Sequence, residues 1–223
     1  TVLLPVTAGM TRDTLMTNLQ AARVGAKLSL GLVEWVQMAY PSAGDTTPPQ
    51  TMTAAEFLSI IAPDAPAELV RTLEPAFVLG IHSFDENQAF IVLQVDVYET
   101  AYAGMLAWEY TMRTDLAPLF TRTPSPRLQT QVPGPAMSSP QAATSSATTT
   151  QPAEAAPLAI QTGFVDKIVA NRDVRLVENS QGDILLLWTM LGRNSVVITT
   201  NEYTLREVIS RMTAAPVVPT PGR

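Results

Sequence analysis

The chain has no cysteine and only one histidine, His82, among its 223 residues. The absence of cysteine excludes disulfides, thiolate metal ligands and cysteine nucleophiles. A single histidine excludes metal sites that need two or more histidine ligands. We predict no cofactor and no metal site.

Motifs that bind phosphate or present a catalytic serine are missing as well. The sequence contains no Gly-x-Gly-x-x-Gly loop, no Walker pattern and no Gly-x-Ser-x-Gly elbow. Its 14 basic residues are outnumbered by 20 acidic ones and form no dense cluster. Because phosphate backbones demand a clustered basic surface, nucleic acid is not an expected partner.

No apolar run is long enough to cross a bilayer. The best candidate, residues 28–39, is interrupted by Glu34 and is shorter than the roughly 20 residues that a spanning helix needs. The sequence has no start methionine and no signal peptide. We interpret it as a piece of a longer polypeptide, and we expect contact with a membrane only through an anchor outside this piece.

One segment differs sharply in composition from the rest. Residues 121–163 hold seven prolines and thirteen serines or threonines, and no aromatic residue. Such a segment buries too little apolar surface to offset the entropy of ordering it, and similar tracts form stalks on surface proteins. We predict a disordered linker at 121–163 and a disordered tail at 214–223.

The segment before the linker, residues 1–120, predicts an α+β part. Helices are indicated after Thr11, after the Thr53–Glu56 capping box and near Pro66. A longer helix, predicted from Tyr98 to Leu116, should stop at Pro118. The expected strands are Val2–Val6, an apolar stretch over 28–36, and a hairpin of Ala76–Phe84 and Ala89–Val97 with its turn at 85–88.

The segment after the linker, 164–213, predicts an αβββα unit. Its helices are expected at 164–170 and after a Thr199–Glu202 capping box, and its strands at 174–178, 184–191 and 195–200. A unit of about 50 residues is marginal alone, so we expect it to dock on residues 1–120. The predicted fold class is α+β, with antiparallel or mixed sheets, packed helices and two halves joined by the linker.

Few polar residues stand out as candidates for chemistry. His82 lacks a motif partner, so a hydrogen-bonded structural role is expected for it rather than catalysis. Acidic pairs such as Asp96 with Glu99 match no calcium loop. We expect Glu109 to pair with Arg113 one helical turn away. No catalytic residue is predicted.

The densest polar cluster is Asn171, Arg172, Asp173 and Arg175. An arginine fork binds carboxylates well, so this cluster is the candidate interaction surface. The alternative is a structural corner between a helix and a strand, with Asn171 ending the helix and Arg and Asp pairing locally.

Several segments together resemble a known family. They are Tyr102–Glu109, Asp115–Phe120, Asn171–Arg175 and Val197–Glu202. They resemble uncharacterised proteins of candidate-phylum bacteria with reduced genomes, which carry an N-terminal transmembrane helix, a Pro-rich segment and a soluble α+β region. The resemblance implies an envelope-anchored protein on the extracytoplasmic face and no catalytic residues. The linker of this chain is unusually long for that family.

Three functions remain open at this point. The first is a non-enzymatic interaction or assembly domain of a membrane-anchored envelope protein, with protein partners in the envelope and an undetermined oligomeric state. The second is a membrane-proximal subunit of a type IV pilus or secretion machine, an option that rests on fold analogy. The third is an envelope hydrolase, which would need His82 or a carboxylate pair to lie in a pocket.

Overall fold

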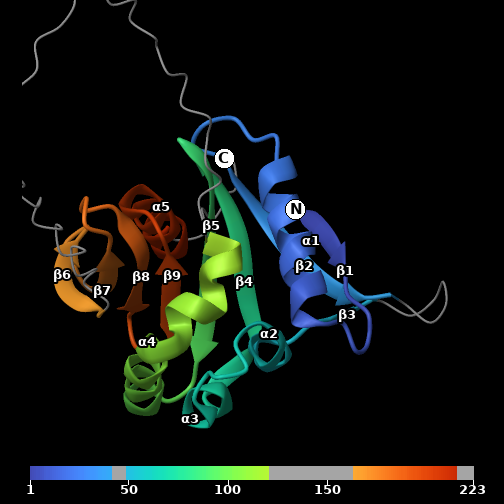
Figure 1. The fold of residues 1–223 in the computed structure, drawn as a ribbon, viewed down its shortest axis with the longest axis horizontal. Helices are drawn as coiled ribbons and strands as arrows, with labels where there is room; N and C mark the ends of the chain where they lie inside the picture. Colours follow the sequence, from blue (N-terminus) through green and yellow to red (C-terminus); the bar gives the residue numbers. More distant parts are fainter. Residues whose placement is uncertain (42–48, 121–162, 215–223) are drawn as a thin grey trace, which may run out of the picture. The chain divides into compact units, whose positions relative to one another are not determined.

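The computed structural model describes residues 1–41, 49–120 and 163–214. These residues form five helices and one mixed sheet of nine strands (Figure 1). The predicted α+β class with a mixed sheet is confirmed. The predicted linker lies outside the described residues except for Gly163, and the predicted tail except for Ala214.

The sheet combines strands from both ends of the chain. In spatial order it runs β1 (Val2–Pro5), β2 (Val33–Tyr40), β4 (Leu73–Phe84), β5 (Glu86–Val95), β9 (Ser195–Thr199), β8 (Ile184–Leu191), β7 (Arg172–Glu178) and β6 (Val165–Val169), while the short β3 (Gln50–Thr51) pairs with β2. β1 runs parallel to β2, and every other described pair is antiparallel. Pairing of β5 with β9 joins the segment before 121 to the segment after 162.

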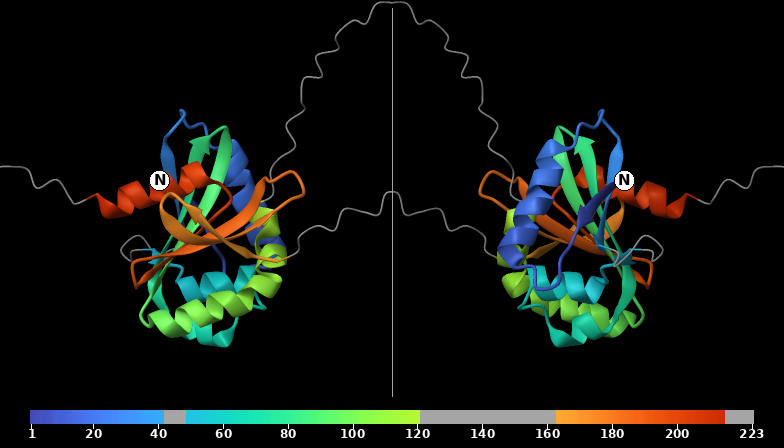
Figure 2. Two further views of the ribbon diagram at one scale, coloured as in Figure 1. Left: turned by 90° about the vertical axis from the view of Figure 1, so that its left-hand side faces the viewer. Right: turned by 90° about the vertical axis from the view of Figure 1, so that its right-hand side faces the viewer.

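Helices cover the two faces of the sheet unequally (Figures 1 and 2). Side chains of α1 (Arg12–Gly25), α2 (Ala54–Ile61), α3 (Ala67–Arg71) and α4 (Tyr98–Phe120) share one large core with the sheet. On the other face, α5 (Glu202–Thr213) packs Leu205 and Val208 into a smaller core. The second face is therefore only partly covered by a helix.

The central strands are buried on both faces. Trp188 and Ile198 belong to the larger core, whereas their neighbours Leu187 and Val197 belong to the smaller one. Side chains of a strand alternate between faces, so consecutive apolar residues are expected where both faces are covered. The run of apolar residues in β8 and β9 has this physical reason.

Two of the three predicted helix caps are present. Thr11 accepts a hydrogen bond from the Thr14 amide, and Thr53 with Glu56 forms the capping box of α2. The predicted cap at Thr199 is wrong, because Thr199 ends β9 and its hydroxyl donates to the Ala89 carbonyl. Asn201 caps α5 instead, since its side chain accepts from the two amides that follow Glu202.

The helix predicted at 164–170 is also wrong, because residues 165–169 form strand β6. β6 and β7 make a hairpin in which Val169 pairs with Arg172. The two residues between them, Ala170 and Asn171, have φ values of 52° and 59°. Positive φ at both central positions is typical of a type I′ turn, which suits the twist of a hairpin. Asn171 therefore turns a hairpin and does not end a helix.

The tip of the β4–β5 hairpin is shorter than predicted. β5 begins at Glu86, so residues 86–88 belong to the strand rather than to the turn. Asp85 alone separates the strands, with a φ of 61°, a value that Asp tolerates better than most residues.

Helix α4 continues past the predicted stop at Pro118 and ends at Phe120. Proline has no amide hydrogen, so it leaves the carbonyl four residues earlier, on Thr114, without its helical partner. Arg12 of α1 donates to the carbonyls of Thr114 and Asp115 at 3.3 and 2.8 Å. A side chain from another helix thus offsets the cost of the proline.

Candidate functional site

A polar hollow of about 350 Å³ lies where the start of α4 faces the strands β6, β7 and β8. All four residues of the predicted interaction cluster line it. The structure adds aromatic and acidic side chains that sequence analysis did not single out: Tyr98, Tyr102, Asp166 and Trp188. These residues come from positions up to 90 apart in the chain, so no local motif could have revealed them.

The floor of the hollow is a fixed ion pair. Arg175 donates to both carboxylate oxygens of Glu109, at 2.8 and 2.6 Å, and Trp188 Nε1 donates to the same carboxylate at 3.0 Å. Arg175 also lies 3.2 Å from a carboxylate oxygen of Asp166. Hydrogen bonds with Glu109 are the main reason why the pKa of Arg175 is raised, and those with Asp166 add to the effect.

This geometry corrects two expectations. Glu109 does not pair with Arg113 along α4, because its carboxylate faces the sheet and is held there by Arg175. Arg175, in turn, uses its fork inside the protein and is not free to bind a partner. Arg175 supports the predicted interaction surface rather than forming part of its exposed face.

The other three residues of the predicted cluster face solvent at the rim. Asn171 sits in the hairpin turn, Arg172 begins β7 and is half-buried, and Asp173 is exposed. Within the described part of the chain, the Arg172 guanidinium forms neither an ion pair nor a hydrogen bond. A half-buried arginine with unused donors has already lost part of its hydration, which favours recognition of a partner's acceptor groups.

The part of the hollow that α4 contributes is aromatic and also well fixed. Tyr98 and Tyr102 lie one turn apart on α4 with their rings stacked 5.9 Å apart, and Tyr102 meets Trp188 edge to face at 5.6 Å. Arg193 lies over the Tyr98 ring at 5.3 Å and pairs with Glu99 at 2.7 Å. Tyrosine, tryptophan and arginine are the side chains most enriched at the energetic centres of protein interfaces.

His82 lies apart from the hollow. Its Nδ1 is 2.9 Å from the Thr204 hydroxyl, and both side chains are buried between β4 and α5. Burial lowers the pKa of His82, because the charged imidazolium is poorly solvated there; Glu207 opposes this shift and Arg211 adds to it. The geometry agrees with the hydrogen-bonded structural role predicted for this residue.

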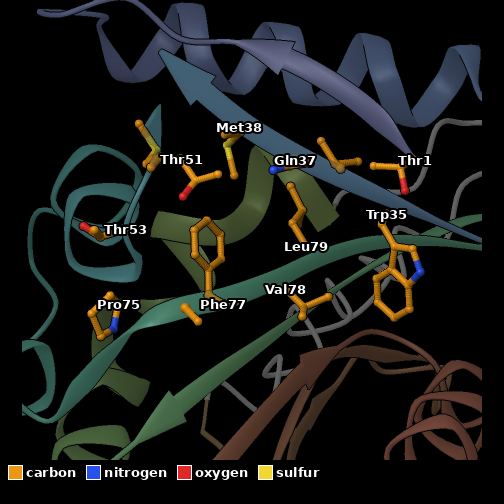
Figure 3. A pocket seen from close by; sticks show the side chains of 13 residues that line it. Thr1, Trp35, Gln37, Met38, Thr51, Thr53, Pro75, Phe77, Val78 and Leu79 are labelled. Atoms are coloured by element: carbon orange, nitrogen blue, oxygen red, sulfur yellow. The ribbon is translucent and has the colours of Figure 1, made fainter. Parts of the chain in front are cut away.

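A second cavity, of about 470 Å³, opens between β2 and β4 (Figure 3). The two strands converge near Trp35 and separate toward Thr53 and Pro75. No aspartate, glutamate, lysine or arginine lines it, and its walls are mostly apolar. Sequence analysis did not predict this groove, because it arises from where two strands stop pairing.

Neither a metal-binding cluster nor a membrane-spanning helix occurs among the described residues. Over 1–41, 49–120 and 163–214, no group of three or more His, Cys, Asp or Glu side chains is placed to hold a metal ion. In the same ranges, no helix combines the length and the hydropathy that a membrane span needs.

Comparisons with known proteins gave no match: no family model, no curated protein and no solved structure is significantly similar to this chain.

Proposed function

We propose that the protein is a non-enzymatic interaction or assembly domain that binds a protein partner through the hollow between α4 and β7. The observation that carries the proposal is the half-buried Arg172, whose guanidinium makes no hydrogen bond or ion pair with the described residues, in a hollow that Asp173, Tyr98 and Tyr102 also line. The partner surface that fits it presents carboxylate or carbonyl acceptors to Arg172.

The walls of the hollow are rigid, which favours a role in binding a partner. The Glu109–Arg175–Trp188 bonds and the stacked tyrosines fix the walls on secondary structure rather than on loops. A site that is already ordered loses little conformational entropy when a partner docks. The volume of about 350 Å³ is small, so it suits one or two anchoring side chains of a larger interface.

The proposal places this domain on the extracytoplasmic face of a bacterial envelope, tethered by an anchor outside the sequence. The support is the stalk-like composition of residues 121–163 and the resemblance to anchored envelope proteins. A membrane-proximal pilus or secretion subunit is one form that such an assembly domain can take, and it would use the same surface.

The test is photo-crosslinking in the cells that make the protein. Benzoylphenylalanine at the exposed position Asp173 should crosslink to one discrete partner in the envelope fraction. The same probe at Tyr110, a side chain that is 95% exposed on α4, should not give that product. Arg172→Glu should reduce the Asp173 crosslink roughly tenfold, the scale expected when one central side chain of an interface is lost.

Arg113→Glu is the matched control, because Arg113 is exposed on α4 and does not line the hollow. This variant should leave the crosslink unchanged. Equal products from probes at Asp173 and Tyr110, or an Asp173 product that survives Arg172→Glu, would contradict the assignment of the binding surface.

A further inference from the structure

The groove between β2 and β4 exposes a strand edge inside the sheet. The two strands pair only from Val33–His82 to Val36–Leu79, and β4 then continues for six more residues toward its start at Leu73. Beyond Val36, the last two residues of β2, Ala39 and Tyr40, pair instead with the two-residue strand β3. The first half of β4 therefore has no partner on the β2 side, and it pairs with β5 only at Leu73, Phe77 and Val78, with an irregularity in the register between Leu73 and Phe77.

The direction of the unpaired backbone groups follows from the ladder. Ser83 donates to the Leu32 carbonyl and accepts from the Gly31 amide, so its backbone groups point toward β2. Backbone groups of a strand alternate in direction, so Leu79 and Phe77 point the same way. Leu79 lies in the last β2–β4 pair, whereas the described residues offer Phe77 no backbone partner on this side.

The side chains around this edge are mostly apolar, and none of those that line the groove is charged. Val78 and Phe77 of β4 are half-buried, Trp35 of β2 is 38% exposed, and Met38 closes the groove from the β2 side (Figure 3). Exposed strand edges pair readily with another chain, and native proteins usually protect them with charge or bulges. No side chain that lines this groove is charged, which disfavours a charged occupant. An irregularity between Leu73 and Phe77 interrupts the start of β4, so Phe77 is the residue whose backbone groups are open to pairing.

We propose that the groove binds an extended, uncharged, apolar segment of a partner polypeptide, which adds as a short strand beside the first half of β4. The Phe77 amide and carbonyl would form two backbone hydrogen bonds with it, and alternate side chains of the segment would contact Trp35 and Val78. The volume of about 470 Å³ corresponds to a few residues of extended chain. This site is separate from the hollow that carries the proposed function.

The experiment uses the full chain and a displayed random library of uncharged heptapeptides. Enriched peptides should carry apolar residues at alternate positions. Their binding is followed by acrylamide quenching of tryptophan fluorescence, because Trp35 is 38% exposed while Trp108 and Trp188 are 0% and 1% exposed. Peptide binding should shield Trp35 and slow amide exchange at Phe77 by roughly tenfold or more.

Two controls separate a strand from a simple apolar ligand. Ala76→Lys places a charge at an exposed position in the groove and should weaken binding at least about tenfold, whereas Ala21→Lys, at an exposed position on α1, should not. A bound peptide that is N-methylated at the amide facing β4 should lose binding, because it keeps its apolar surface but cannot donate to Phe77.

Three outcomes would overturn the proposal. One is that the unmodified protein enriches no peptide more strongly than the Ala76→Lys protein does. Another is equal binding of the N-methylated peptide, which would indicate a site for apolar molecules in general. The third is a dimer of the chain that Ala76→Lys disrupts in the absence of peptide, which would make a second copy the occupant.

Discussion

The ion pair beneath the hollow gives the sharpest stability prediction. Replacing Glu109 with alanine removes the acceptor of two Arg175 donors and of Trp188 Nε1. Losing one partner of a fully buried pair costs about 3–5 kcal/mol, mainly because the other charge is left uncompensated. The Arg175 side chain is 21% exposed and keeps Asp166 as a neighbour, so the lower end of that range applies. We expect Glu109→Ala to lower the free energy of unfolding by about 3 kcal/mol.

Related variants separate charge from hydrogen bonding. Glu109→Gln keeps an acceptor for Trp188 and should cost about 1–2 kcal/mol. Glu99→Ala is the matched control on the same helix, because the Glu99–Arg193 pair is 71% and 77% exposed and should contribute at most about 1 kcal/mol. The measurement is urea unfolding followed by circular dichroism at neutral pH. If Glu109→Ala were no more destabilising than Glu99→Ala, the buried ion pair would not hold α4 on the sheet as argued.

Two further predictions concern the sheet beneath α5. A Cβ atom on Gly80 would lie 2.2 Å from the Phe90 ring, so Gly80→Ala should lower the free energy of unfolding by roughly 1–3 kcal/mol. Gly25→Ala, which meets no atom within 4 Å, should cost less than about 0.5 kcal/mol in the same urea titration, and equal costs would contradict the packing argument. Because burial lowers the pKa of His82, the unfolded chain takes up a proton at higher pH than the folded one, so stability should fall as the pH drops below 6.5. His82→Gln should reduce this pH dependence in thermal melts at pH 7.5 and 5.5; an unchanged difference would show that other groups cause it.

The elements that sequence patterns predicted well are those with local causes. Thr11 and the Thr53–Glu56 pair satisfy helix amides within their own turn, so their side chains alone indicate where α1 and α2 begin. Ala101, Met105, Trp108 and Met112 have the four-, three- and four-residue spacing of one helical face, and all four side chains of this face of α4 are buried. Interactions between residues close in sequence determine these features, and the tertiary structure preserves them.

The errors occur where a distant residue changes the outcome. Pro118 removes one helical hydrogen bond, but Arg12, more than one hundred positions earlier, supplies a donor that lets α4 continue. Residues 165–169 contain three β-branched residues and end in Ala170-Asn171, and the β7 strand that they pair with decides their conformation. Glu109 pairs with Arg175 rather than with Arg113, because the sheet places the less exposed Arg175 guanidinium beside the Glu109 carboxylate. None of these partners lies within the four or so residues of sequence that a local pattern covers.

The two proposed binding surfaces lie far apart in the sheet, which makes their tests independent. The groove forms at β2 and β4, the hollow at β6, β7 and β8, and β5 and β9 stand between them. No residue lines both cavities, so Ala76→Lys should leave the Asp173 crosslink intact and Arg172→Glu should leave peptide binding intact. A domain with two separate surfaces can bind two partners at once, which is what an assembly role requires. If each variant instead abolished both interactions, the two surfaces would be coupled through the fold, and their assignment to separate partners would fail.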